Sequence, residues 1–236
     1  MATGTLYLIP TPLGAGELNW ILPTGVQQQI SRLQRFIVEH PKTARHFLKQ
    51  LNLQQTIQTL QLEVLDKHTP ATELETLLAP LLAGEDVGLL SEAGCPAVAD
   101  PGSPLVRLAH RKHVRVVPLV GPSAILLALM ASGLNGQQFC FHGYLPIDPA
   151  ACAKKIAELE KASIAANTTQ IFIETPYRNR KLLQALVEQC HATTDLTIAC
   201  NLTQLDELIL TQAISIWRQG NWPDLHKKPT VFLLHG

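Results

Sequence analysis

The sequence predicts an α/β protein, with a mostly parallel sheet in its first half and a mixed sheet in its second half. Short apolar runs alternate with helix-like segments along the 236 residues, which is typical of βα units. Two of these runs, 86–90 and 114–120, end in turns rich in Gly, Pro and Ser at 91–104 and 121–124. In parallel sheets ligands bind outside the carboxyl ends of the strands, so we expect these two turns to hold a ligand.

The elements of the first half follow from this alternation. Strands are expected where β-branched and apolar residues are concentrated, at 5–10, 35–39, within 58–66, 86–90 and 114–120. Helices are expected between them, at 24–34, 43–51, 72–83 and 103–112. Because every strand is followed by a helical segment, the sheet is predicted to be mostly parallel.

The pattern restarts after the helix expected at 124–133, so we place the domain boundary at 120/121, giving domains 1–120 and 121–236. Strands are expected at 138–143, 169–174, 196–201, 207–213 and 230–235. Helices are expected at 150–163 and 177–191. The late strands lack full helices between them, which predicts antiparallel pairs and a mixed α+β sheet.

Composition bounds the class of protein. Nineteen basic residues balance nineteen acidic ones, unlike the strongly basic composition of a dedicated nucleic-acid binder. An odd number of cysteines without a CxxC pair, and no secretory signal, predict a cytoplasmic protein. No apolar run approaches the roughly 20 residues of a membrane span. His110 and His113 lack partners for a ligand set, so no metal site is predicted.

Acidic residues placed after strands are the candidates for chemistry or ligand anchoring, and they are Glu39, Glu92, Asp100 and Glu174. Glu92 directly follows a buried strand and has no capping role, which favours a function. Asp100 could instead be the N-cap of the helix at 103–112.

Two further turns have both a structural and a functional interpretation. In ETPYR, Thr175 fits the cap and Pro176 the first turn of the helix at 177–191. Ser123 could cap the helix that follows it, bind a ligand, or do both.

The segment GAGELN at 14–19 leaves a nicotinamide-binding oxidoreductase open as an alternative. It follows a strand, and Glu39 ends the next strand, where a ribose-binding acid belongs. However, Asn19 replaces the third glycine of the fingerprint, and Pro10 and Pro12 precede the first glycine. The fingerprint is therefore incomplete.

Five motifs occur in order along the chain: LYLIPTPLGAG (6–16), SEAGCPAVADPG (91–102), VVPLVGPSA (116–124), FHGYLP (141–146) and FIETPYR (172–178). Together they resemble the tetrapyrrole (corrin/porphyrin) methylase superfamily, which uses S-adenosylmethionine. The motifs are most similar to its branch of small-subunit ribosomal RNA methyltransferases, which are 2′-O-ribose methylases.

The resemblance implies two α/β domains with the cofactor in the cleft between them, in a homodimer. The cofactor contacts that it implies are Pro12, Ser91, Glu92, Ala93, Gly94, Ser123, Ala124, Leu145, Ala199 and Pro229. Turns that expose backbone N–H and C=O groups can hold the carboxylate, amine, sulfonium and adenine of S-adenosylmethionine without a charged cage.

The chain departs from this branch at charged positions. VEHPKTAR at 38–45 stands where the branch has an AEDTR run, and a proline interrupts the segment. Cys200–Gln204 replaces an Arg-Glu-Leu-Thr-Lys run, and Lys228–Thr230 replaces a Lys-Gly-Glu run. The cofactor loops are kept, so the resemblance implies methyl transfer more directly than an RNA acceptor.

The predicted reaction is a single in-line displacement of the methyl group from the sulfonium by a nucleophile. A ribose hydroxyl as acceptor needs a base, for which Glu92 and Glu39 are the candidates by position, whereas a tetrapyrrole carbon would not need the same base. Ribosomal RNA is the expected acceptor, and a small molecule such as a tetrapyrrole is the alternative. Arg45, Arg178 and Arg180 are the basic residues expected to contact RNA.

Overall fold

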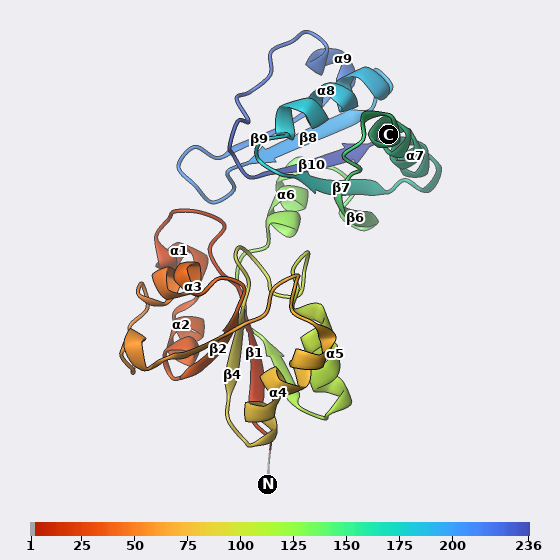
Figure 1. Cartoon of the computed structure of the whole chain (residues 1–236). Helices are drawn as coiled ribbons and strands as arrows, with labels where there is room; N and C mark the ends of the chain where they lie inside the picture. The colour runs from red at the N-terminus through yellow and green to blue at the C-terminus, as the bar shows by residue number, and fades with distance from the viewer. Residues whose placement is uncertain (1–2) are drawn as a thin grey trace. The chain divides into compact units, whose positions relative to one another are not determined.

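The computed structural model describes residues 3–236 and contains two compact units, Met1–Ser123 and Ala124–Gly236 (Figure 1). The division falls three residues after the boundary drawn from the sequence. Each unit has its own five-stranded sheet and its own hydrophobic core. The α/β class, with one parallel and one mixed sheet, is confirmed.

The sheet of the first unit is parallel throughout, with strand order β3-β2-β4-β1-β5. Its strands are β1 (Thr5–Ile9), β2 (Arg35–Val38), β3 (Gln61–Val64), β4 (Val87–Leu90) and β5 (Arg115–Pro118). In register, Leu6 lies opposite Val87 on one side and Val116 on the other. The strand order changes direction after β3, so the chain crosses to the other face of the sheet there.

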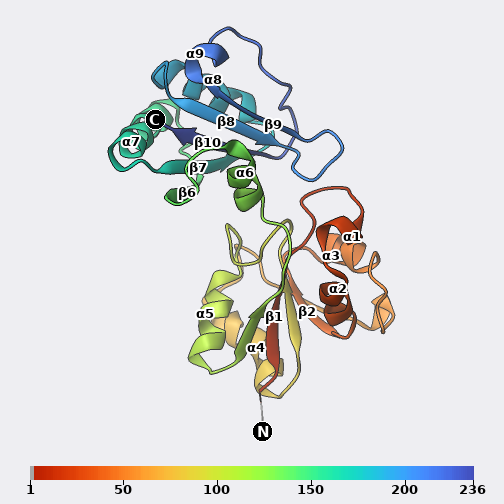
Figure 2. The same ribbon diagram turned by 180° about the vertical axis from the view of Figure 1, so that it is seen from behind.

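Helices therefore cover both faces of this sheet, as Figures 1 and 2 show. One face carries α1 (Leu18–Ile21), α2 (Thr24–Ser31) and α3 (Pro41–Leu48). The other face carries α4 (Leu74–Leu82) and α5 (Ser103–Arg111), and two 3₁₀ turns, η1 (Ile57–Thr59) and η2 (Ala71–Glu73), complete the unit. Successive residues of β2 show the two-sided burial, since Phe36 joins the α2/α3 cluster and Ile37 joins the α4/α5 cluster.

The sheet of the second unit has the order β6-β7-β10-β8-β9, in which only β6 and β7 run parallel. Its strands are β6 (Phe139–Tyr144), β7 (Thr169–Glu174), β8 (Asp195–Cys200), β9 (Leu208–Ala213) and β10 (Thr230–His235). Its helices are α6 (Ala124–Ser132), α7 (Pro149–Ala166), α8 (Asn179–Gln189) and α9 (Ile214–Trp217).

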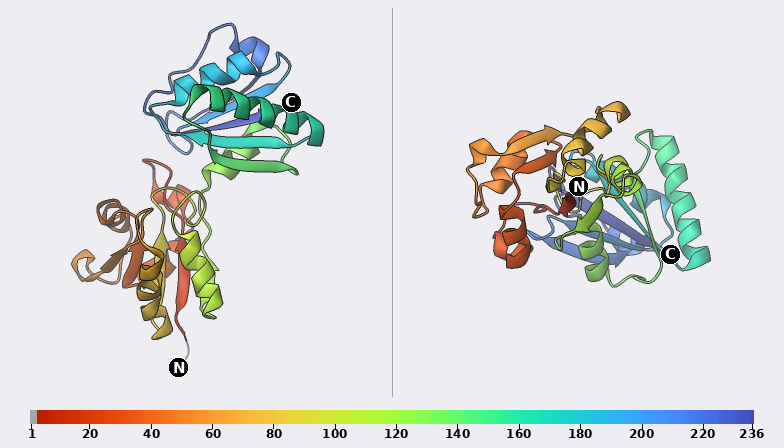
Figure 3. Two further views of the ribbon diagram at one scale, coloured as in Figure 1. Left: turned by 45° about the vertical axis from the view of Figure 1, so that its right-hand side comes forward. Right: turned by 90° about the horizontal axis from the view of Figure 1, so that it is seen from below.

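The two faces of the second sheet are covered by different helices. On one face, α7 and α8 cover the sheet (Figure 3). The core on this face contains Phe172, Phe232 and Trp217. On the other face, α6 is tied to the sheet by the Thr211 hydroxyl, which donates to the Ser132 carbonyl at 2.8 Å and also contacts the Thr197 hydroxyl. The unit is therefore layered, with its sheet in the middle.

The helix start predicted at 103 is confirmed, whereas the start predicted at 177 and both candidate N-caps are wrong. The N-cap of α5 is Gly102, and Asp100 does not cap this helix. Helix α8 begins at Asn179 with Arg178 as its N-cap, so Thr175 and Pro176 belong to the preceding turn. The short helices α1 and α9 were not predicted, because four residues are too few to show a helical period.

Within residues 3–236 no helix is both long enough and apolar enough to span a membrane.

Candidate active site

A pocket of about 490 Å³ lies in the first unit, at the carboxyl ends of β1, β2 and β4. Three segments form its walls: the turn after β1, helix α3 after β2, and the start of the turn after β4. The lining residues are Thr11, Pro12, Gly14, Ala15, Gly16, Thr43, Ala44, His46, Phe47, Gln50, Ser91 and Glu92. This is the edge of a parallel sheet where ligands bind, and the volume is typical of sites for small ligands.

The turns after β1 and β4 are linked by hydrogen bonds although they are 80 residues apart in sequence. The Thr11 N–H donates to the Gly94 carbonyl, and the Gly94 N–H donates to the Thr11 carbonyl, each at 3.0 Å. The Thr11 hydroxyl donates to the Ser91 carbonyl at 3.1 Å, and the Ser91 hydroxyl donates to the Gly94 carbonyl at 2.6 Å. Both hydroxyl-bearing residues are buried, so these bonds fix one wall of the pocket.

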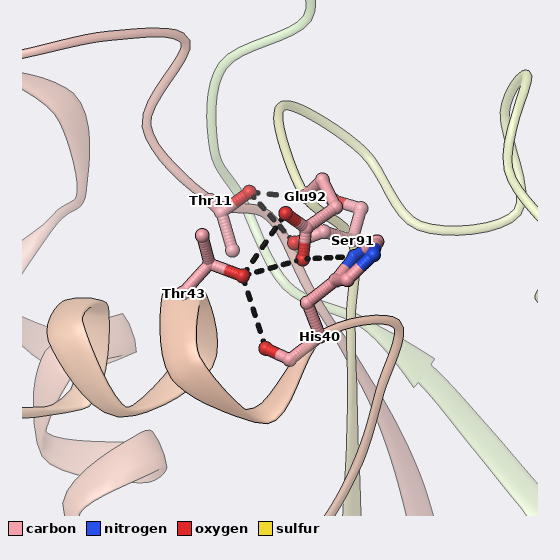
Figure 4. A network of polar contacts seen from close by, with 5 residues as sticks. All are labelled: Thr11, His40, Thr43, Ser91 and Glu92. Atoms are coloured by element: carbon pink, nitrogen blue, oxygen red, sulfur yellow. Dashed lines mark hydrogen bonds and ion pairs between the residues drawn. The ribbon is translucent and has the colours of Figure 1, made fainter. Parts of the chain in front are cut away.

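Glu92 is held from the opposite wall by the residues that begin α3 (Figure 4). The Thr43 hydroxyl lies 2.8 Å from Oε1 and 3.0 Å from Oε2 of Glu92, and it also lies 3.0 Å from the His40 carbonyl. His40 Nδ1 lies 3.5 Å from Glu92 Oε1. A hydroxyl has one hydrogen, so Thr43 donates to Glu92 or to His40 and not fully to both.

Local sequence explains why α3 places Thr43 there. Pro41 is the first helical residue, a position that suits its fixed φ and its missing N–H. The proline therefore starts this helix, two residues before the start at 43 that the sequence predicted. Ala44, Phe47 and Leu48 face the core, and the helical period then leaves Thr43 and His46 outside the core, on the pocket wall.

Glu39 lies beside this cluster and has a perturbed acidity. Burial raises the pKa of its carboxyl group, and the negative charge of Glu92 raises it further, while His40 opposes the shift. The carboxylates of Asp100 and Asp66 add smaller increases to the pKa of Glu39. A carboxyl group whose charged form is disfavoured beside another carboxylate is typical of functional sites.

The raised pKa of Glu39 gives a prediction about stability. Glu39 holds its proton more tightly in the folded state than in the unfolded state. The free energy of unfolding therefore falls as the pH rises from the unfolded pKa of Glu39 through its raised folded pKa. Glu39→Gln removes this loss, so we expect the variant to be more stable than the wild type at pH 8 and equally stable below pH ~4. Urea unfolding at both pH values measures the difference, and a variant that loses stability at pH 8 would contradict the assignment.

Asp100 stabilises the turn that carries the site. Its Oδ1 accepts hydrogen bonds from the Gly102 N–H at 2.6 Å and the Ala97 N–H at 2.8 Å. Ala97 and Ala99 have positive φ angles of 64° and 55°, which non-glycine residues rarely adopt. Burial raises the pKa of Asp100, and the two N–H bonds oppose the shift. Its observed role is therefore to hold a strained turn.

The structure brings only some of the residues predicted from the sequence to the pocket. Pro12, Ser91 and Glu92 line it, and the same turn continues into Ala93 and Gly94. Ser123 does not line the pocket; its side chain hydrogen-bonds the Cys95 thiol, whose pKa is raised mainly by burial.

The remaining predicted contacts belong to the second unit. Leu145 packs into the core with Phe172, and Ala199 is buried in β8 opposite Val231. Ala124 begins α6, and the Pro229 carbonyl accepts the Asn201 N–H at 2.9 Å. Their role toward a cofactor stays a prediction.

Two of the arginines expected to contact RNA have partners inside the second unit. Arg178 is bound to Glu174, with Nη2 at 2.6 Å from Oε1, and the Glu174 side chain is only 7% exposed. Arg180 stacks over the ring of Trp222. Glu174 is thus the partner of Arg178, and this interaction explains the acid at the end of β7.

The contribution of α3 to the pocket was not predicted from the sequence. Thr43 and His46 come from this helix, Gln50 follows its C-cap, and His40 supports Glu92 from its N-cap position. The available signal was the apolar spacing of Ala44, Phe47 and Leu48, which defines the opposite face as polar. Within residues 3–236, no three His, Cys, Asp or Glu side chains are grouped so that they could hold a metal ion.

Comparison with known proteins identifies the class. Residues 5–215 match the family described as Tetrapyrrole (Corrin/Porphyrin) Methylases. The crystal structure of the methyltransferase CobJ superposes with a TM-score of 0.64 and 18% identity, covering 100% of this chain and 95% of that one. A uroporphyrin-III-C-methyltransferase from Thermus thermophilus gives a TM-score of 0.55 and 16% identity, over 98% and 92% of the two chains. The chain belongs to the tetrapyrrole methylase family and is a methyltransferase.

Within that family, its sequence relatives are ribosomal RNA small subunit methyltransferases I. The relative from Vibrio cholerae is 32% identical over 98% of this chain and 77% of its own length. The relative from Escherichia coli O157:H7 is 35% identical over 87% of this chain and 68% of its own length. The resemblance of the five motifs to this branch is thereby confirmed.

Proposed function

We propose that this methyltransferase transfers a methyl group from S-adenosylmethionine to a ribose hydroxyl of small-subunit ribosomal RNA. The observation that carries the proposal is the pocket lined by the turns after β1 and β4, in which Thr43 anchors the carboxylate of Glu92. The names of the sequence relatives support the RNA acceptor.

The residues of the pocket fit this donor. The turn after β1 contributes Gly14, Ala15 and Gly16, which leave room for a ligand to approach the backbone closely. Glu92 is the only carboxylate among the lining residues, and it offers a negative charge to a sulfonium or amine. S-adenosylmethionine, when bound, supplies an already activated methyl group. We assign the donor to the wall made by the turns after β1 and β4, and the acceptor to the wall made by α3.

In this proposal Glu92 is the general base. Its carboxylate accepts the proton of the acceptor hydroxyl, which makes the oxygen a better nucleophile. The Thr43 hydroxyl orients the carboxylate, and the Thr11–Ser91–Gly94 hydrogen bonds keep the turn that carries Glu92 in place. Alignment of this kind contributes up to roughly 7–11 kcal/mol in well-oriented systems. Glu39 does not line the pocket, and its carboxylate interacts with that of Glu92 through charge.

The nicotinamide alternative has little support from the pocket. The glycine segment at 14–16 leads into α1, which has only four residues and begins at Leu18. A dinucleotide fingerprint instead opens a full helix, whose N-terminus holds the pyrophosphate. A tetrapyrrole acceptor is the alternative that the following experiments distinguish.

We expect isothermal titration to show one saturable site for S-adenosylmethionine per chain. The pocket is pre-formed by buried hydrogen bonds, so binding does not require the turns to reorder. NADH serves as the matched control and should give no heat of binding. Binding of NADH, with no binding of S-adenosylmethionine at millimolar concentration, would refute the donor assignment.

The acceptor is tested with radiolabelled S-adenosylmethionine and small ribosomal subunits from a strain that lacks the cognate methyltransferase. We expect label in the RNA, at a ribose that becomes resistant to alkaline cleavage. A porphyrinogen mixture is the parallel substrate, and label found only there would move the acceptor to a tetrapyrrole. We also propose a homodimer, as the resemblance implies, which sedimentation velocity measures.

A further inference from the structure

One helix of the first unit concentrates positive charge beside the pocket. Residues 40–62 contain Lys42, Arg45 and Lys49, two histidines, and no Asp or Glu, although the chain as a whole is neutral. Lys42, Arg45 and Lys49 follow one another at intervals of three and four residues, and His46 lies beside Arg45, so the four residues form one stripe along α3 and its C-cap. All four residues are exposed. We call these four residues the α3 basic stripe.

The charges of the stripe are available to a partner. Among the residues that the structure describes, no carboxylate lies within ion-pair distance of Lys42, Arg45 or Lys49. This differs from Arg35, Lys112, Arg178 and Lys228, each of which has an acidic partner. Three neighbouring unpaired cations repel one another, and a polyanion relieves that repulsion.

The stripe directly borders the pocket. Its member His46 is a lining residue, and so are Thr43 on the same helix and Gln50 just after the helix C-cap. A backbone bound along α3 therefore passes the carboxylate of Glu92, which Thr43 holds. This placement is what a polymeric acceptor needs, because its phosphates must lie beside the reacting group.

An exposed aromatic side chain accompanies the stripe on the same face of the sheet. Trp20 on α1 is 89% exposed, whereas Trp217 is 1% exposed. Its helix packs through Leu18 and Ile21 against the same cluster as Phe47 of α3, and it follows the pocket-lining turn 14–16 directly. Exposed aromatic rings next to cations are the means by which proteins bind unstacked bases and single-stranded backbone.

We propose that the α3 basic stripe and Trp20 form the RNA-binding surface of this methyltransferase, with phosphates along α3 and an unstacked base on Trp20. The inference rests on the proposed RNA acceptor. It moves the expected RNA contact away from Arg178 and Arg180, whose side chains are engaged with Glu174 and Trp222. Arg45 is the one residue common to both assignments.

The test compares two triple variants by their salt-dependent affinity for protein-free small-subunit RNA. Lys42→Gln/Arg45→Gln/Lys49→Gln should make the negative slope of log K against log salt shallower by about 2–3, because each lost phosphate contact removes roughly 0.7–0.9 from its magnitude. The control is Arg107→Gln/Arg111→Gln/Arg115→Gln, which removes three exposed arginines from α5 and β5. Its slope should equal that of the wild type.

A second pair of variants tests the aromatic part. Trp20→Ala should weaken RNA binding by about 5- to 150-fold, and Trp20→Phe should restore most of the loss, since base stacking needs only a flat ring. Binding of S-adenosylmethionine should stay unchanged in all of these variants, which shows that the fold and the pocket are intact. Lys42→Arg/Lys49→Arg should keep the wild-type slope.

The outcomes separate this inference from the proposed function. If the wild type methylates RNA and the α3 triple variant keeps the wild-type slope, the surface is wrong and the acceptor stands. If the wild type neither binds nor methylates RNA, the acceptor is wrong. If the triple variant loses affinity for assembled subunits but not for free RNA, the stripe contacts a ribosomal protein, and the inference is overturned.

Discussion

Glu92→Gln is expected to lower the rate of methyl transfer by about 10²–10⁴-fold, the usual contribution of a positioned general base. The amide keeps the size of the side chain and can still accept a hydrogen bond from Thr43, but it cannot take a proton from the acceptor hydroxyl. Single-turnover transfer of label from saturating S-adenosylmethionine to small ribosomal subunits measures the chemical step without product release.

The matched control for this substitution is Glu75→Gln, which removes an exposed carboxylate that pairs with Lys112 outside the pocket. Its rate should be that of the wild type. Donor affinity should fall far less than the rate of methyl transfer, because the substitution removes only one charge that faces the donor while the backbone groups of the two turns remain. A variant with normal turnover would exclude Glu92 as the base, and a variant that loses donor binding with unchanged single-turnover chemistry would make it a donor-binding residue.

The sequence predicted the framework of the first unit because its strands are buried on both faces. The residues after Asp86, Val87–Leu90, carry no polar side chain, and in β4 all four are buried between two layers of helices. A strand of this kind is recognised by its continuous apolar residues, and it must lie inside the sheet because both of its faces are covered. Because ligands bind outside the carboxyl ends of parallel strands, Ser91 and Glu92 could be placed in the site without information on any side-chain contact.

The network around Glu92 could not be predicted in the same way. Thr43 and Glu92 are 49 residues apart, and their contact depends on β2 lying next to β4 in the sheet. That neighbour relation arises because the chain crosses past β2 after β3 and inserts β4 between β2 and β1, which no local pattern encodes. The proline at 41 was equally ambiguous, because a proline that begins a helix and one that interrupts it look the same in a single sequence.

Asp100 shows the limit of capping arguments. Asp100 is an acid three residues before the first residue of α5 and is of a type that often caps helices, yet its carboxylate accepts hydrogen bonds from the N–H groups of Ala97 and Gly102 within the turn. The positive φ angles at Ala97 and Ala99 require this support, and they are properties of the folded turn. The sequence therefore identified a functional turn but not what keeps it rigid.

Gly121→Ala is expected to lower both the stability and the donor affinity, because Gly121 packs against Pro10, the residue before the pocket-lining Thr11. A Cβ at this position would lie 2.5 Å from Cβ and 2.8 Å from Cγ of Pro10, which are atoms of a rigid ring. Relieving the clash must move Pro10, and Thr11 follows it directly. Thr11 makes the hydrogen bonds to Ser91 and Gly94, so the linked turns should separate.

Overpacking of this kind costs about 1–3 kcal/mol, and we expect the free energy of unfolding to fall by that amount. Donor affinity measured by titration should fall with it, since Thr11 and Ser91 line the pocket. Gly25→Ala is the matched control: nothing lies within 4 Å of its added Cβ, and it sits in α2. That variant should keep donor affinity and gain up to about 1 kcal/mol, because alanine favours helix more than glycine does. If both variants bind the donor equally well, the contact between Pro10 and Gly121 does not hold the pocket wall in place.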